Sequence, residues 1–127
     1  MVIKVYYHWK EVAGLRNKGY EKIMDEFMTA FDKHFGDKID EFMVLNQTDT
    51  PITSFRFEFT MYKYFAVVFD FERAHFGCAI LVGSGSIPLR LSQGWYDNFK
   101  MKTFLKELQE QIELRIPDKF LEYNGWK

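Results

Sequence analysis

The sequence has one cysteine, Cys78, and so contains no pair that could form an internal disulfide. That usage is typical of proteins in a reducing compartment. No apolar run approaches the roughly 20 residues that span a bilayer. The first residues show neither the long apolar core nor the small-residue cleavage site of a signal peptide. We therefore expect a cytoplasmic protein that does not associate with membranes.

The chain also lacks a surplus of positive or negative charge. The chain carries 17 basic and 18 acidic residues, for a formal net charge of −1. Proteins that bind nucleic acid or anionic membranes usually have a basic surplus. The basic glycine-aromatic signature of sheet-type RNA-binding modules is absent as well. We therefore expect no nucleic-acid partner.

Aromatic residues, in contrast, are abundant and make up 19% of the 127 residues, a length that suits one domain. Between Ser54 and Leu91 they alternate with polar residues, and short breaks interrupt the run. Such alternation is typical of successive β-strands. We predict a four-strand antiparallel meander, with strands at about 52–61, 64–71, 75–82 and 87–91.

Three features of this run predict how the strands are placed. Residues 65–69 are apolar on both faces, which predicts a central strand. Pro88 cannot donate a backbone hydrogen bond, so the last strand is expected at an edge. Gly77 lies within the third strand and predicts a bulge or a close approach of another backbone.

The N-terminal third contains one amphipathic helix and two further strand candidates. From Asn17 to Phe35, apolar residues recur at spacings of three and four, which predicts a helix with Asn17 as N-cap and Gly36 as the terminating glycine. The alternation at 2–9 predicts an N-terminal strand, and residues 40–45 predict another short one.

The C-terminal third predicts a second amphipathic helix at about 99–115. Asp97 or Asn98 is expected to cap it, and Pro117 to end it. Residues 118–127 are too apolar for a free tail, so we expect them to pack against the rest of the domain.

These elements predict a single α+β domain over residues 1–127. We expect a mostly antiparallel sheet, formed by the meander and the N-terminal strand, with both helices packed on one face. The opposite face then exposes polar and aromatic side chains. The side chains expected to be buried together are Phe27, Phe31, Phe55, Phe57, Phe65, Val67, Phe69, Ile80, Leu105 and Leu108.

Asp70, Glu72 and His75 form the densest group of ionisable residues. The two acids are two positions apart on a strand and share a face. They could bind a metal with His75 or act as an acid/base pair. We favour a strand that runs into a charged turn, because no second cluster of ligands is visible.

Two other features of the sequence are candidates for catalysis. Cys78 lies in an apolar strand, which predicts a buried, inert thiol. Residues 83–86 read Gly-Ser-Gly-Ser but lack the lysine and following helix of a phosphate-binding loop, so a hairpin turn is the better interpretation. Neither Ser84 nor Ser86 has the context of a hydrolase nucleophile. We predict no catalytic residue, no cofactor and no metal.

A protein-binding role is the largest class that remains. In its overall plan, over Ser54–Leu91 and the closing residues 116–127, the chain resembles bacterial immunity proteins of contact-dependent inhibition and other polymorphic-toxin systems. The resemblance implies a non-enzymatic inhibitor that occludes a cognate toxin by direct contact. A phage- or mobile-element-encoded inhibitor of a host enzyme and a small-molecule-binding α+β domain stay open as alternatives, as does a homodimer.

We expect the protein partner to contact exposed aromatic and charged residues of the open sheet face and its neighbouring loops. Such residues often dominate interface energies or tune association rates. The candidates are Arg56, Glu58, Tyr62, Tyr64, Asp70, Glu72, Trp95 and Tyr96.

Overall fold

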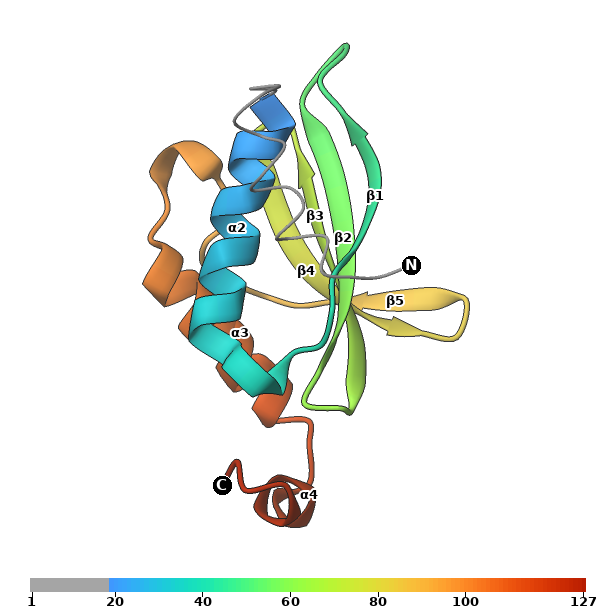
Figure 1. The fold of residues 1–127 in the computed structure, drawn as a ribbon, viewed down its shortest axis with the longest axis vertical. Helices are drawn as coiled ribbons and strands as arrows, with labels where there is room; N and C mark the ends of the chain where they lie inside the picture. Colours follow the sequence, from blue (N-terminus) through green and yellow to red (C-terminus); the bar gives the residue numbers. More distant parts are fainter. Residues whose placement is uncertain (1–18) are drawn as a thin grey trace.

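A computed structural model describes residues 19–127 of the chain. The strand predicted at 2–9 and the Asn17 cap lie outside these residues. The described part is a five-strand antiparallel sheet with two long helices on one of its faces (Figure 1). The prediction of an α+β fold with both helices on the same side of the sheet is therefore confirmed.

The five strands follow one another in space in the same order as in the sequence, and each pairs with the next in antiparallel fashion. The strand at residues 65–72 is central, as predicted. The strand at residues 85–88, which contains Pro88, is at an edge, also as predicted. The strands are β1 (Met43–Thr48), β2 (Ser54–Met61), β3 (Phe65–Glu72), β4 (His75–Val82) and β5 (Gly85–Pro88).

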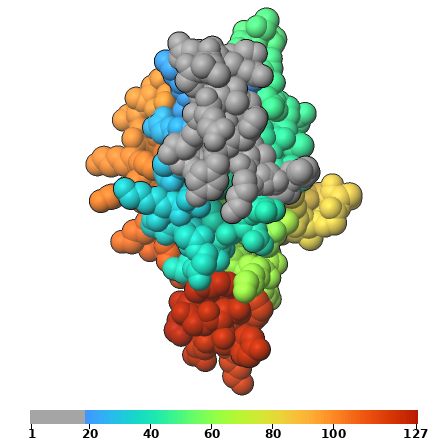
Figure 2. Space-filling view, in the orientation of Figure 1, coloured from blue at the N-terminus to red at the C-terminus, as the bar shows by residue number. Residues whose placement is uncertain are grey.

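The helices are α2 (Gly19–Phe35), α3 (Met101–Glu113) and the short α4 (Asp118–Tyr123). Gly36 follows α2 with a φ of +54°, the left-handed conformation expected of a terminating glycine. In Figure 2, residues 118–127 form a knob at one end of the molecule, and the β4–β5 hairpin projects from its side.

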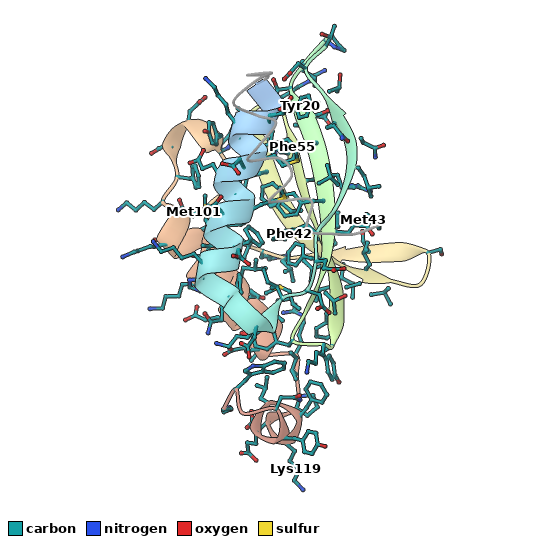
Figure 3. All side chains as sticks on the ribbon, in the orientation of Figure 1. Tyr20, Phe42, Met43, Phe55, Met101 and Lys119 are labelled. Atoms are coloured by element: carbon teal, nitrogen blue, oxygen red, sulfur yellow. The ribbon has the colours of Figure 1, made fainter. Side chains whose placement is uncertain are left out.

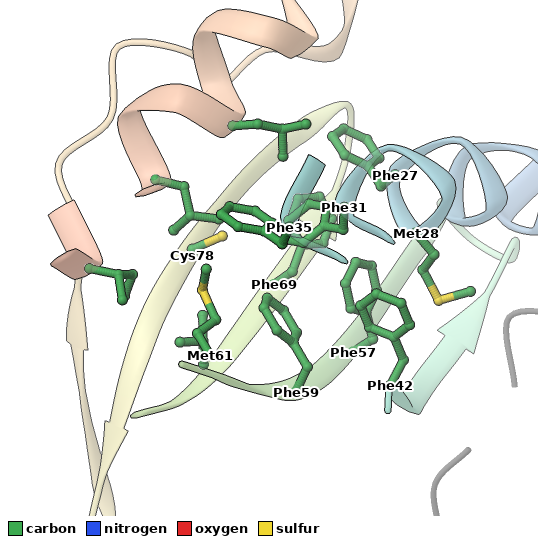
Figure 4. Close-up of a cluster of buried hydrophobic side chains, with 14 of the residues drawn as sticks. Phe27, Met28, Phe31, Phe35, Phe42, Phe57, Phe59, Met61, Phe69 and Cys78 are labelled. Carbon is green, nitrogen blue, oxygen red and sulfur yellow. The ribbon is translucent and has the colours of Figure 1, made fainter. Parts of the chain in front are cut away.

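The core lies between the helices and the sheet, where phenylalanine rings from both layers meet (Figure 4). Phe31 of α2 packs against Phe59 of β2 with 5.2 Å between ring centroids, and against Phe69 of β3 at 5.8 Å. Phe42 and Phe55 point toward α2, whereas Met43 points away from it (Figure 3). All the predicted core residues are buried except Phe65, which is half-buried.

The C-terminal segment packs against the body, as predicted, although its helix α4 was not expected. Leu121 is buried, and the Trp126 ring meets that of Tyr62 edge-on, with 5.5 Å between centroids. Pro117 directly precedes α4, and α3 has already ended at Glu113.

Several boundaries differ from those predicted. β1 begins at Met43 rather than at residue 40, because Ile39 and Asp40 instead bond to the end of β2. β5 spans Gly85–Pro88 rather than 87–91. The predicted caps of the second helix are wrong, because Asp97 and Asn98 belong to a 3₁₀ turn at Tyr96–Asn98.

The position before α3 is Lys100, whose side chain caps nothing. Its backbone N–H instead donates to Oε1 of Gln93 at 2.8 Å. None of the described helices is both long and apolar enough to cross a lipid bilayer.

Candidate binding surface on the open sheet face

The strand register places two rows of side chains on the sheet face opposite the helices. In one row, Arg56 is paired with Asp70, and Asp70 with Gly77. In the other, Ser54 is paired with Glu72 and Glu72 with His75, and an isolated bridge adds Trp95. Residues 54–95 thus bring acids, an arginine and an aromatic ring together at one end of the sheet.

Arg56 and Asp70 form a two-point ion pair across β2 and β3. Nε of Arg56 donates to Oδ1 of Asp70 at 2.7 Å, and Nη2 donates to Oδ2 at 3.2 Å. The hydrogen bond to Asp70 raises the pKa of Arg56, against the opposing effect of desolvation. Both side chains remain about half exposed, so the pair stays accessible to a partner.

A concavity of about 520 Å³ lies beside this ion pair, lined by residues of β3, β4 and the following loop. Gly77 is in its lining, and a Cβ added there would meet none of the atoms of residues 19–127 within 4 Å. The pairing of β4 with β3 runs through Gly77 without a shift of register. The predicted bulge or close approach at Gly77 is therefore wrong, and the missing side chain contributes to the hollow. The lining residues are Asp70, Glu72, Arg73, His75, Phe76, Gly77 and Trp95.

Trp95 forms one wall of the concavity and is 58% exposed. Its ring lies against that of His75, with 4.3 Å between centroids. The surrounding loop is tied to β4, because Phe76 N–H donates to Gly94 O at 2.9 Å and Tyr96 N–H donates to Ala74 O at 2.8 Å. Backbone hydrogen bonds of the residues before and after Trp95 therefore fix the position of the chain that carries this exposed indole.

The turn between β3 and β4 has a strained backbone. Its two central residues, Arg73 and Ala74, have φ values of +55° and +64°. Positive φ at both positions is typical of a tight hairpin, where glycine and asparagine are favoured. For residues with a Cβ this conformation costs on the order of 1 kcal/mol each. The bond from Tyr96 to Ala74 holds this turn beside the concavity.

The structure brings only some of the predicted partner-binding residues together. Arg56, Glu58, Asp70 and Glu72 project from the open face of β2 and β3, with Trp95 at its border. Tyr64 is 42% exposed but lies in the β2–β3 turn, at the other end of these strands.

Two tyrosines among the predicted partner-binding residues form hydrogen bonds with side chains of helices. Tyr62 is fully buried, so its predicted exposure is wrong; its hydroxyl donates to Oε2 of Glu113 in α3 at 2.5 Å. Burial and this bond raise the pKa of Tyr62 above its usual range. Tyr96 is half-buried and donates to Oε1 of Glu26 at 2.6 Å. Burial, with that bond, raises its pKa to about 12.

The groups considered for catalysis or metal binding are arranged as follows. Cys78 is buried, and desolvation raises the pKa of its thiol, so the prediction of a buried thiol is confirmed. Within residues 19–127, no three His, Cys, Asp or Glu side chains converge as metal ligands. Gly83 and Ser84 form the tight turn between β4 and β5, which confirms the predicted hairpin, but Gly85 and Ser86 already belong to β5.

Sequence reasoning missed the wall formed by His75 and the hollow at Gly77. A glycine at an outward-facing strand position, two residues after a histidine, was the available signal. Its interpretation as a hollow required the knowledge that no other segment of residues 19–127 covers it. Comparison with protein-family models, with curated proteins and with solved structures found no match to this chain.

Proposed function

We propose that the chain is a non-catalytic protein-binding inhibitor that uses the open sheet face around Trp95. The observation that carries this proposal is the exposed indole of Trp95, fixed against His75 and next to the Arg56–Asp70 pair. Tryptophan and arginine are the residues most often found at the energetic centre of protein interfaces. A rigid aromatic side chain also loses little conformational entropy on binding.

The inhibitor role is that of an immunity protein that neutralises a cognate toxin by contact. This part of the proposal rests on the resemblance of overall plan over Ser54–Leu91 and the closing residues. Toxins that act on nucleic acid need basic active sites to bind phosphates. Glu58, Asp70 and Glu72 lie on the same face of adjacent strands and could cover such a site.

Affinity capture with matched variants tests the proposal. Tagged protein is incubated with an extract of its own cells, next to a Trp95→Ala variant and a Tyr123→Ala control. Tyr123 is 89% exposed but lies on α4, away from the sheet face. We expect the wild type and the control to retain the same protein, and Trp95→Ala to bind it about tenfold or more weakly.

The captured protein is then assayed for its own activity with and without the purified chain. An immunity protein abolishes a toxic activity at an equimolar ratio, and a phage-type inhibitor does the same to a host enzyme. Retention that is equal in all three samples, or an active partner that the chain leaves unaffected, contradicts the proposal. A small-molecule-binding domain retains no protein through Trp95.

A further inference from the structure

The concavity beside Gly77 combines an aromatic wall with carboxylates. Glu72 is exposed, and no hydrogen bond or ion pair with another residue of 19–127 uses its carboxylate. Each oxygen of Asp70 accepts one bond from Arg56 and keeps a second lone pair. Acceptors are therefore available on one side, and an indole face on the other.

The lining offers an unpaired carboxylate to a cation. Arg56 neutralises Asp70 at the border of the hollow, so Glu72 is the carboxylate there that has no ion-pair partner among residues 19–127, and Arg73 supplies the one positive charge of the lining. Tryptophan is the best aromatic partner for a cation, and a guanidinium both stacks on an aromatic ring and binds carboxylates through two parallel bonds. An anionic or purely apolar group would meet the unpaired carboxylate of Glu72 there.

We propose that this concavity receives an arginine side chain of the protein partner, between the Trp95 ring and the Asp70 and Glu72 carboxylates. The inference rests on the proposed protein-binding function and specifies the chemistry of the contact. Gly77 has a specific role in it, because the absent side chain leaves the depth that a guanidinium needs.

A substitution at Gly77 is expected to fill the hollow without disturbing the fold. A Cβ added there meets no atom of the described residues within 4 Å, and the φ of Gly77 is not in the left-handed region. Valine favours strands, so Gly77→Val is expected to fold at least as stably as the wild type while filling the hollow. Ala79→Val is the matched control. Ala79 is two positions along on the same face of β4 and is not part of the lining.

The test uses nuclear magnetic resonance titration with blocked amino acids, so it does not depend on the partner. The probes are N-acetyl-arginine amide and its neutral analogue N-acetyl-citrulline amide. We expect the arginine probe to shift the Gly77 amide and the Trp95 indole N–H saturably. Its affinity should exceed that of the citrulline probe about fivefold at low salt. Ala79→Val should respond like the wild type, and Gly77→Val should lose the shifts.

Equal affinities for the two probes, shifts that persist in Gly77→Val, or no saturable shift at these positions would overturn the inference. These results leave the proposed function intact if Trp95→Ala still loses the captured protein. The reverse combination, arginine binding without any protein captured through Trp95, retains the cation site and contradicts the proposed function instead.

Discussion

Tyr96 connects the loop after β5 to α2 through a hydrogen bond to Glu26. Burial, and secondarily this bond, raise the pKa of Tyr96 from the usual 10.0 to about 12. Because the folded state holds the phenolic proton more tightly than the unfolded state, this stabilisation is complete below pH 10. It is lost as the pH rises from 10 toward 12.

We therefore predict that Tyr96→Phe lowers the free energy of unfolding by about 1 kcal/mol at pH 7. The difference from the wild type should be constant up to about pH 9 and should narrow above pH 10. Urea unfolding at a series of pH values measures it. A difference that stays constant to pH 12 would show that the hydroxyl is not protected in the folded state.

For single residues, the local sequence pattern was sufficient to predict burial in some cases and not in others. Phe55 and Phe57 were predicted to be buried because alternation alone assigns them to one face. Tyr62 was predicted to be exposed because it lies in a turn, but α3 and the C-terminal residues close over it. Such coverage depends on contacts between distant segments, which no local pattern encodes.

Phe27 is one of the residues that dock α2 onto the sheet. Its ring centroid lies 4.6 Å from that of Phe69 and 5.0 Å from that of Phe76, and it also stacks on Phe99 at 5.5 Å. Phe27→Ala leaves a cavity between a helix and two strands that cannot fully collapse. We predict a loss of about 3–5 kcal/mol in the free energy of unfolding.

Denaturant unfolding with Asp32→Ala as the control measures this loss. Asp32 is exposed on the same helix, and its substitution should change stability by less than about 0.5 kcal/mol. An unchanged midpoint for Phe27→Ala would contradict the observed docking.

Among the elements, those with long and regular patterns were predicted well. The periodicity of α2 and the alternation of β2 to β4 give bounds close to those observed. β1 was shifted because residues 39–40 bond to the end of β2 instead. The six-residue helix α4 was missed because it is too short to show a helical period, and its Leu121 is buried only through tertiary packing.

At the scale of the whole molecule, the near-zero net charge conceals a local arrangement of acids on the open face. If the partner is basic, Asp70 and Glu72 accelerate encounter by attraction at a distance. We predict that the double variant Asp70→Lys, Glu72→Lys slows association about tenfold at low salt, and less at high salt because mobile ions screen the attraction. The fold should persist, since both side chains are exposed.

Stopped-flow association with the captured partner tests this prediction. The control is Asp118→Lys, Glu122→Lys, which makes the same change in net charge on the exposed surface of α4. If both double variants slow association equally, the effect comes from net charge rather than from the sheet face. Unchanged kinetics in the first would exclude electrostatic steering by these acids.

The consecutive order of the strands has a consequence for how the chain reaches its native state. Each of the strands β1 to β5 pairs with its sequence neighbours among them, so this sheet can grow from any one hairpin by adding the next. Short loops are closed at each step, which keeps the entropic barrier low compared with sheets that need long crossovers. Contacts between α2, near one end of the described residues, and α3, near the other, close the longest loops. Helix docking is therefore expected to complete folding after the meander has formed.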